Sequence, residues 1–378
     1  MARARKVEGL EIGWSAKGSF PIRISENLFD VENLTVAETL REVTGVDKPR
    51  VMLVADANVV QRTEGLGTRI GKYVQTHGIE LAGAPVVMGG GEKIKTDNLQ
   101  SVLRIVDAAL EAKIGVTDVM MVLGGGTLLD VAGYAACQVR GGVKLVRVPT
   151  TVAAMTDAAL SETAAVNSTN VKDAMRVASR PAAVLVDPTF AKTVLDGVWR
   201  GGLGEIIRQA AVLDAPLMKK LAKSGEALRN RDMALLGEVV RDILSTRAKK
   251  GGTDVALWCA MRLEAMSGYK LPHGYAVPIG VCIDCAYAVE KGLMAEADQE
   301  LVGRTLADCG ALDGLAHSQH LLSQAENILF GLDAWRLATG AEAVPLPGGI
   351  GKAVAEASPD RDAYRKVIKA FLAVSSEA

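Results

Sequence analysis

The chain has 378 residues, and its 43 lysines and arginines almost balance its 44 aspartates and glutamates. This near-neutral charge argues against nucleic acid or an anionic membrane as a partner, because both attract an excess of positive charge. Hydrophobic residues make up 49% of the chain and aromatic residues only 4%, which is typical of an α/β enzyme with two domains.

The first half alternates short apolar runs with helical patterns. The pattern predicts buried strands near the start of 50–58 and over 84–88, 118–123 and 144–148, with helices over 62–77, 98–112 and 131–139. Strands that alternate with helices form a parallel sheet with right-handed crossovers. The first half is therefore predicted to be a Rossmann-like α/β domain.

Helical periodicity dominates after Asp187-Pro188. Helices are predicted over 200–225, 231–250, 254–267, 274–292, 295–309, 316–330 and 360–375. This change of character places a domain boundary near residue 188. We expect an α/β domain over residues 1–188 and an all-helical domain over 189–378.

The five cysteines are scattered and odd in number, which predicts reduced thiols in a cytoplasmic protein. Cys282 and Cys285 form a CxxC within an apolar run, and we expect a buried helical pair rather than a zinc or redox site. The apolar runs fall short of the roughly 18–20 residues that a membrane span requires. We therefore expect no membrane segment.

Three consecutive glycines, Gly124, Gly125 and Gly126, stand between a predicted strand and a predicted helix. Backbone N–H groups in such a turn can approach a pyrophosphate, and the helix dipole favours its charge. This context favours a nucleotide site, although the ordinary GxGxxG fingerprint is absent. Asp56 and Asn58 follow the first strand, at the sheet edge where open α/β sheets bind ligands.

Eight motifs occur in a recognisable order. They are Asp56-Ala-Asn58, Gly91-Glu-Lys-Ile-Lys95, Gly124-Gly-Gly-Thr-Leu-Leu-Asp130, Val148-Pro-Thr-Thr151, Asp157, Val166-Asn167, Gly202-Leu-Gly-Glu205 and His273-Gly274. Their order and spacing resemble the dehydroquinate synthase family and, more broadly, the sugar phosphate cyclases, which include the epi-valiolone synthases. The resemblance runs from about residue 50 to 352 and is closest to a divergent branch of dehydroquinate-synthase-like proteins.

The resemblance implies an N-terminal NAD domain, a C-terminal helical domain, an active site in the cleft between them, and a homodimer. In this family NAD oxidises a secondary alcohol of a phosphorylated sugar, phosphate is eliminated, and an aldol step closes a carbocycle. A divalent metal, usually zinc, polarises the oxygens through these steps.

The resemblance also carries roles to positions of this chain. Asp157, Lys172 and Arg208 would face the substrate, Glu264 would complete the polar set, and Glu205 and His273 match two of the metal ligands. The residues implied for NAD are Asp56, Asn58, Glu92, Lys95, Gly124, Gly125, Gly126, Asp130, Thr150, Thr151 and Thr193.

Several residues at the positions expected to bind metal and phosphate differ from the family pattern. Leu257 stands where a metal-binding histidine is expected, and Met261 replaces a second histidine. A catalytic zinc ion normally has three protein ligands, so the remaining pair is incomplete and bound zinc is doubtful. Thr163 replaces a lysine and Asp173 an asparagine, which predicts weaker phosphate binding.

Several functions stay open at this point. The first is an NAD-dependent cyclase-like lyase with an altered, phosphorylated sugar substrate and a degenerate metal site, acting in a specialised biosynthetic pathway. The second is a non-catalytic relative that binds NAD or a partner. The others are an ordinary metal-dependent sugar phosphate cyclase and a metal-dependent alcohol dehydrogenase, both of which require a complete ligand set.

Overall fold

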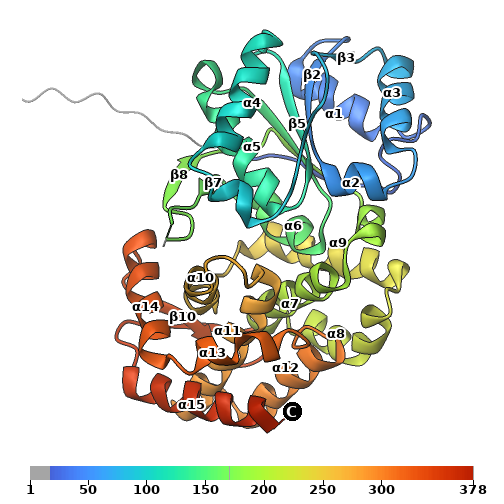
Figure 1. Ribbon diagram of the computed structural model, residues 1–378. Helices are drawn as coiled ribbons and strands as arrows, with labels where there is room; N and C mark the ends of the chain where they lie inside the picture. Colours follow the sequence, from blue (N-terminus) through green and yellow to red (C-terminus); the bar gives the residue numbers. More distant parts are fainter. Residues whose placement is uncertain (1–17, 170, 378) are drawn as a thin grey trace, which may run out of the picture.

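The computed structural model describes residues 18–169 and 171–377, and it has an α/β half and a helical half (Figure 1). A parallel sheet forms the centre of the first half, in the order β1-β9-β6-β5-β2-β3, with β4 also paired to β2. Its strands are β1 (Ile22–Ile24), β2 (Arg50–Asp56), β3 (Glu80–Leu81), β4 (Val86–Met88), β5 (Val119–Gly124), β6 (Lys144–Pro149) and β9 (Ala183–Val186). The parallel sheet predicted from the alternating pattern is confirmed.

Helices cover this sheet and connect its strands. They are α1 (Thr35–Thr44), α2 (Ala57–Arg62), α3 (Leu66–His77), α4 (Gln100–Glu111), α5 (Gly126–Gln138) and α6 (Val152–Thr156), with short 3-10 turns η1 (Glu92–Lys95), η2 (Val139–Gly141), η3 (Ala158–Leu160) and η4 (Pro188–Thr193). An antiparallel pair, β7 (Thr163–Val166) and β8 (Met175–Ala178), lies beside α5. The sequence pattern did not predict β1, β7, β8 or β9, which have only three or four residues each.

The second half is helical apart from one hairpin. Its helices are α7 (Asp196–Leu213), α8 (Ala215–Arg229), α9 (Met233–Lys250), α10 (Leu257–Met266), α11 (His273–Glu290), α12 (Glu296–Asp308), α13 (Gln319–Leu322), α14 (Ala325–Thr339) and α15 (Arg361–Glu377), with the 3-10 turn η5 (Leu315–Ser318). The hairpin joins β10 (Val344–Pro347) to β11 (Ala353–Glu356). The description all-helical was therefore wrong for 344–356.

The helix predicted over 200–225 is two helices. Asp214 ends α7 and caps α8, because its carboxylate accepts a hydrogen bond from the backbone N–H of Leu217 at 3.0 Å. Pro216 lies in the first turn of α8, where its missing N–H costs nothing, whereas it would interrupt the interior of a continuous helix.

Two glycines let α7 approach its neighbours closely. A Cβ atom on Gly201 would lie 2.5 Å from the Cα atom of Gly274 on α11, and one on Gly202 would lie 2.5 Å from the Cβ atom of Val152 on α6. Any side chain at these positions would push the helices apart. The close contact brings Glu205, one turn along α7, next to the start of α11.

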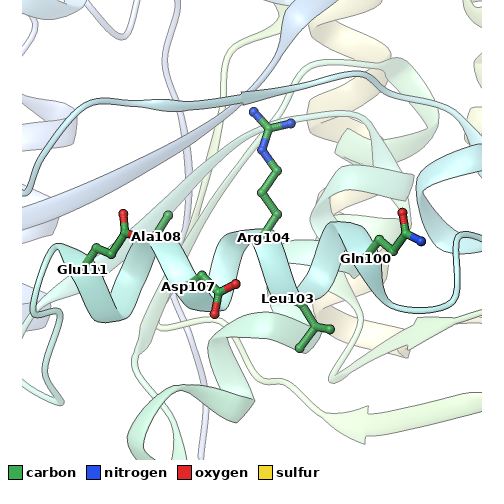
Figure 2. A pocket seen from close by; sticks show the side chains of 6 residues that line it. All are labelled: Gln100, Leu103, Arg104, Asp107, Ala108 and Glu111. Atoms are coloured by element: carbon green, nitrogen blue, oxygen red, sulfur yellow. The ribbon is translucent and has the colours of Figure 1, made fainter.

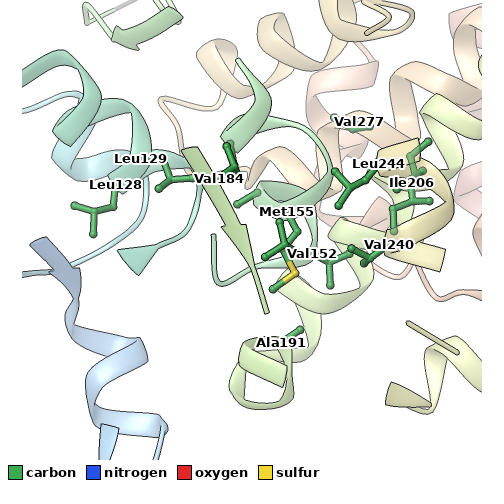
Figure 3. Packing of buried hydrophobic residues seen from close by; sticks show 14 of the residues in the cluster. Leu128, Leu129, Val152, Met155, Val184, Ala191, Ile206, Val240, Leu244 and Val277 are labelled. Atoms are coloured by element: carbon green, nitrogen blue, oxygen red, sulfur yellow. The ribbon is translucent and has the colours of Figure 1, made fainter. Parts of the chain in front are cut away.

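The hydrophobic core is continuous across both halves. Figure 3 shows Leu128 on α5 and Val152 on α6 in the same cluster as Ile206 on α7, Leu244 on α9 and Val277 on α11. Because these residues are almost fully buried, the two halves share apolar packing around α6.

Two remaining sequence predictions concern thiols and membranes. The five cysteines all lie within the described residues and are free, and burial raises the pKa of the Cys282 thiol to about 12. Such thiols are poor nucleophiles and poor metal ligands at neutral pH.

Among the described residues, no helix combines the length and the apolar character that crossing a bilayer requires.

Candidate active site

Glu205 and Arg208 lie one turn apart on α7 and form a buried ion pair. The guanidinium Nη2 atom lies 2.6 Å from Glu205 Oε1, and the Nε atom lies 3.0 and 3.2 Å from the two carboxylate oxygens. Gln209 donates a further hydrogen bond to Oε1 at 2.8 Å. Burial alone would raise the pKa of Glu205, but the adjacent guanidinium outweighs burial and holds it below its ordinary value.

The rest of the Arg208 guanidinium holds the loop before α10. Its Nη1 atom donates to the carbonyl oxygens of Thr253 at 2.5 Å and Val255 at 3.2 Å. Its Nη2 atom lies 3.9 Å from Asp157 Oδ1. The sequence-based expectation placed Arg208 toward the substrate, whereas the side chain is fully buried and most of its N–H groups have protein acceptors.

His273 begins α11 and lies between two carboxylates. Its Nδ1 atom is 2.8 Å from Glu264 Oε1 on α10, and its Nε2 atom is 3.9 Å from Glu205 Oε2. Burial lowers the pKa of the imidazole, but Glu264 outweighs burial and raises it above the ordinary value. About a third of the His273 side chain is exposed, so Nε2 is the ring nitrogen that remains available to a ligand.

Lys172 connects the helical half to the sheet half. Its ammonium group forms an ion pair with the fully buried Glu264 and lies 3.2 Å from Glu92 Oε1. Burial acts against the charge of Lys172, but the two carboxylates outweigh burial and raise the pKa. Asn167 donates to Glu92 Oε2 at 2.8 Å and extends the network.

These contacts form one connected set, which we call the ion-pair chain. Its members alternate in charge and come from both halves of the chain. They are Arg247, Asp157, Arg208, Glu205, His273, Glu264, Lys172 and Glu92. All six residues proposed as catalytic from the sequence belong to it.

Sequence reasoning missed two residues of this region. Arg247, in the last turn of α9, donates to Asp157 Oδ1 at 2.7 Å and to Gln209 Oε1 at 2.9 Å. In the sequence, Arg247 precedes two lysines at a helix end and looks like part of a solvated basic cluster. Gln209 carried a usable signal, because it lies four residues after Glu205 on the same helical face.

The carboxyl ends of β2, β5 and β6 meet at one edge, which we call the glycine edge. Asp56 caps α2 by accepting from the backbone N–H of Asn58 at 2.8 Å, and α5 begins at Gly126 directly after β5. Thr151 caps α6, accepting from the N–H of Ala154 at 3.2 Å. The buried Thr150 Oγ1 atom has no hydrogen-bond partner among the described residues.

Lys95 and its partners lie between the glycine edge and the ion-pair chain. Lys95 Nζ is 2.7 Å from Asp130 Oδ2 and 2.5 Å from Asp173 Oδ1. Burial opposes the charge of Lys95, but the two aspartates outweigh it and raise its pKa. The remaining predicted residue, Thr193, lies at the end of η4, and its hydroxyl donates to the Phe190 carbonyl at 3.3 Å.

The residues present do not fit a catalytic divalent cation. Leu257, at the first position of α10, offers no donor atom, and Met261 follows one turn later. Among the described residues, no three His, Cys, Asp or Glu side chains are grouped so that they could hold a metal ion. Cys259 is completely buried and its Cβ atom packs toward Gly280 on α11.

One surface hollow lies elsewhere on the molecule. It is open and lies along the outer face of α4 (Figure 2). The lining residues are Gln100, Leu103, Arg104, Asp107, Ala108 and Glu111. None of the predicted site residues lines it, so it is separate from the ion-pair chain.

Known proteins match this chain in sequence and in fold. The family model 3-dehydroquinate synthase N-terminal matches residues 85–200. A 3-dehydroquinate synthase of Nostoc punctiforme is 30% identical over 265 residues, which is 66% of this chain and 71% of that protein. One of Rhodopseudomonas palustris is 28% identical over 339 residues, covering 83% of this chain and 86% of that protein.

Two solved structures have the same fold. A 2-epi-5-epi-valiolone synthase from Streptomyces hygroscopicus, with NAD⁺ and Zn²⁺ bound, aligns with a TM-score of 0.82 at 24% identity, covering 97% of this chain and 99% of that one. A 2-deoxy-scyllo-inosose synthase aligns with a TM-score of 0.75 at 19% identity, covering 93% and 96%. At these identities the match establishes the architecture of the chain.

Proposed function

This chain belongs to the dehydroquinate synthase family, and on that premise we propose that it is an NAD-dependent, sugar phosphate cyclase-like enzyme with an altered substrate and a degenerate metal site. The observation that carries the proposal is the ion-pair chain, because the six residues proposed as catalytic converge in it from both halves. We place the enzyme in a specialised biosynthetic pathway and assign residues 1–188 to NAD binding and 189–378 to the helical domain.

NAD fits the glycine edge. The buried Thr150 hydroxyl has no partner in the part of the chain that the structure describes, and Asp56 supplies a carboxylate of the kind that binds ribose hydroxyls. Gly124, Gly125 and the start of α5 would approach the pyrophosphate. Bound NAD would supply hydride acceptance and hydride return. The other residues assigned to it are Asn58, Glu92, Lys95, Gly126, Asp130, Thr151 and Thr193.

The ion-pair chain supports proton transfer by His273. Because Nδ1 is bonded to Glu264, the ring is held in one orientation and Nε2 is left to accept or donate a proton. Lys172 neutralises Glu264 from the other side. In this arrangement Glu264 positions the imidazole, and Asp157 with Arg247 presents polar atoms to the substrate.

The contacts of the residues that differ from the family pattern support an altered substrate. Asp173 pairs with Lys95 at 2.5 Å and adds negative charge where the family pattern has a neutral amide. Thr163 contacts Ser161 at 3.2 Å, and the neighbouring Glu162 pairs with Arg180 at 2.9 Å. These residues favour a substrate that needs fewer cationic contacts than an ordinary sugar phosphate.

The test combines cofactor binding with turnover. Purified protein should bind NAD and release inorganic phosphate or a cyclised product from a panel of ketose phosphates. Asp157→Asn should retain NAD binding and lose turnover, because Asp157 belongs to the substrate side. Turnover that survives both Asp157→Asn and His273→Ala would contradict the assigned site.

A non-catalytic relative is the second candidate. The observation that favours it is the hydrocarbon at Leu257 and Met261, which removes two imidazoles from one face of α10. Protein that binds NAD but processes none of the ketose phosphates, and whose bound NADH is never re-oxidised by them, would support this candidate.

We further propose that the protein is a cytoplasmic homodimer. The five free thiols favour a reducing compartment. Leu103 and Leu110 are seven residues apart on α4 and so share one face of the helix, and both are about half exposed where a second copy would cover them. Light scattering on the purified protein measures the oligomeric state.

A further inference from the structure

Glu205 and His273 lie close to the spacing of a metal-ligand pair. Their Oε2 and Nε2 atoms are 3.9 Å apart, slightly more than the roughly 3.3–3.6 Å between two ligands of a tetrahedral ion with bonds of about 2.0–2.2 Å, so a small side-chain shift would let one cation bridge them. The spacing therefore does not explain why the site suits a metal poorly. The explanation has to come from the third ligand and from the charges around the pair.

The charges around this pair are already balanced. Arg208 forms three close contacts with the Glu205 carboxylate, and Gln209 donates a fourth, so Oε1 is saturated and its charge is neutralised. Glu264, behind His273, is neutralised in the same way by Lys172. A dication would bring two charges into a buried region whose two carboxylates already have cationic partners, which is unfavourable at low dielectric.

Arg208 cannot withdraw easily to admit a cation. Its Nη1 atom is bonded to the carbonyls of Thr253 and Val255, which immediately precede α10. A guanidinium also stays charged at every physiological pH. Moving the side chain would remove this donor from the carbonyls of Thr253 and Val255 and the charged partner from the buried Glu205 carboxylate, which would keep the hydrogen bond from Gln209.

We infer that Arg208 is a specificity-determining residue that excludes divalent metal: its guanidinium is the resident cation of Glu205, and the site works without a metal. This inference deepens the proposed function and rests on it. It also goes beyond the loss of a ligand, because restoring a histidine at position 257 alone would leave the guanidinium in place.

The test measures metal uptake in four proteins incubated with Co²⁺ and then freed of excess ion. They are the wild type, Leu257→His, Leu257→His with Arg208→Met, and Leu257→His with Arg247→Met as the matched control. Metal content and the visible absorption of bound Co²⁺ are read together. Arg247 is the control because it pairs with Asp157 and not with Glu205.

We expect no stoichiometric Co²⁺ in the wild type and weak uptake in Leu257→His. Adding Arg208→Met should tighten Co²⁺ binding on the order of 10- to 100-fold, which is the size of the effect that residues next to metal ligands have on metal affinity. Adding Arg247→Met should not tighten it. If Arg208→Met does not fold, Arg208→Gln takes its place.

Two results would overturn the inference. One is stoichiometric Co²⁺ in the wild type that His273→Ala removes, and this arm needs no variant at position 208. The other is equal uptake with and without Arg208 in the Leu257→His background. NAD binding is measured separately on the same proteins, so failure of the proposed function appears as loss of NAD binding or turnover and is distinct from a metal result.

Discussion

The glycine edge and the ion-pair chain use their polar groups in opposite ways. At the glycine edge the buried Thr150 hydroxyl lacks a partner within the described residues, and glycines leave the backbone open. In the ion-pair chain both buried carboxylates, Glu205 and Glu264, already have a cationic partner. The first region leaves a buried hydroxyl available for a ligand, whereas the second pairs its buried carboxylates with cations of its own.

The largest expected effect comes from breaking the ion-pair chain at its centre. Glu264→Ala leaves Lys172 without its buried partner and His273 without its orienting acceptor, and it should lower the free energy of unfolding by about 3–5 kcal/mol. Denaturant titration measures the change. Glu162→Ala, which removes the exposed pair with Arg180, should cost less than about 1 kcal/mol. Equal losses of unfolding free energy for the two variants would show that the ion-pair chain does not stabilise the fold.

The glycine edge is tested by adding a side chain to it. Gly125→Val puts two methyl groups where a pyrophosphate would approach and crowds Thr151, whose Cγ2 atom would lie 3.2 Å from the new Cβ. The dissociation constant for NAD should rise by about 10- to 100-fold. Gly71→Val on α3 is the matched control, because a Cβ there meets open space. An unchanged affinity of Gly125→Val for NAD would show that the nucleotide binds elsewhere.

A third prediction concerns the pH dependence of stability that Asp284 causes. This residue holds the start of α10 and is not a member of the ion-pair chain. Asp284 on α11 accepts hydrogen bonds from the backbone N–H of Ala256 and from the Trp258 indole, and burial raises its pKa to about 7. The folded state therefore holds a proton that the unfolded state releases near pH 4, so this residue makes stability fall as pH rises toward 7.

Comparison with Asp284→Asn isolates this contribution. Between pH 5 and 7 the wild type should lose about 2 kcal/mol of unfolding free energy relative to Asp284→Asn, because the amide does not titrate. Denaturant titrations of both proteins at each pH give the difference. A difference that stays constant across this range would mean that Asp284 is already ionised in the folded protein.

The smallest expected effect is that of a chelator. Because the charges around Glu205 are balanced by Arg208, incubation with EDTA should change the unfolding free energy by less than about 0.5 kcal/mol and leave NAD affinity unchanged. A clear loss of stability that added zinc restores would show that a metal is part of the folded protein.

Much of the sheet and the glycine edge could be predicted from the sequence. β2, β5 and β6 are short buried runs, mostly apolar, that end in or are followed by polar residues or glycine, and this signal is strong in parallel sheets. The weaker elements, β7 and β8, have four residues each and pair with each other, so their formation depends on tertiary contacts. The break at Asp214 was missed although Pro216 marks it, because periodicity outweighed the turn signal.

The resemblance indicated residues that the fold brings together, but it did not indicate their contacts. The resemblance indicated Glu205, Arg208 and His273 and placed Arg208 toward the substrate, but it gave no sign of the protein acceptors that hold the guanidinium. Its acceptors, the carbonyls of Thr253 and Val255, are backbone groups that residue identity does not reveal. They come within reach because Ala256 adopts a left-handed backbone conformation, φ +68°, that an alanine gives no reason to expect.

The most direct test of the contrast between the two regions is native mass spectrometry of the purified wild-type protein incubated with NAD and Zn²⁺ together. We predict one NAD for each chain and no stoichiometric zinc. One zinc ion for each chain that His273→Ala abolishes, or the absence of any NAD adduct, would contradict the account.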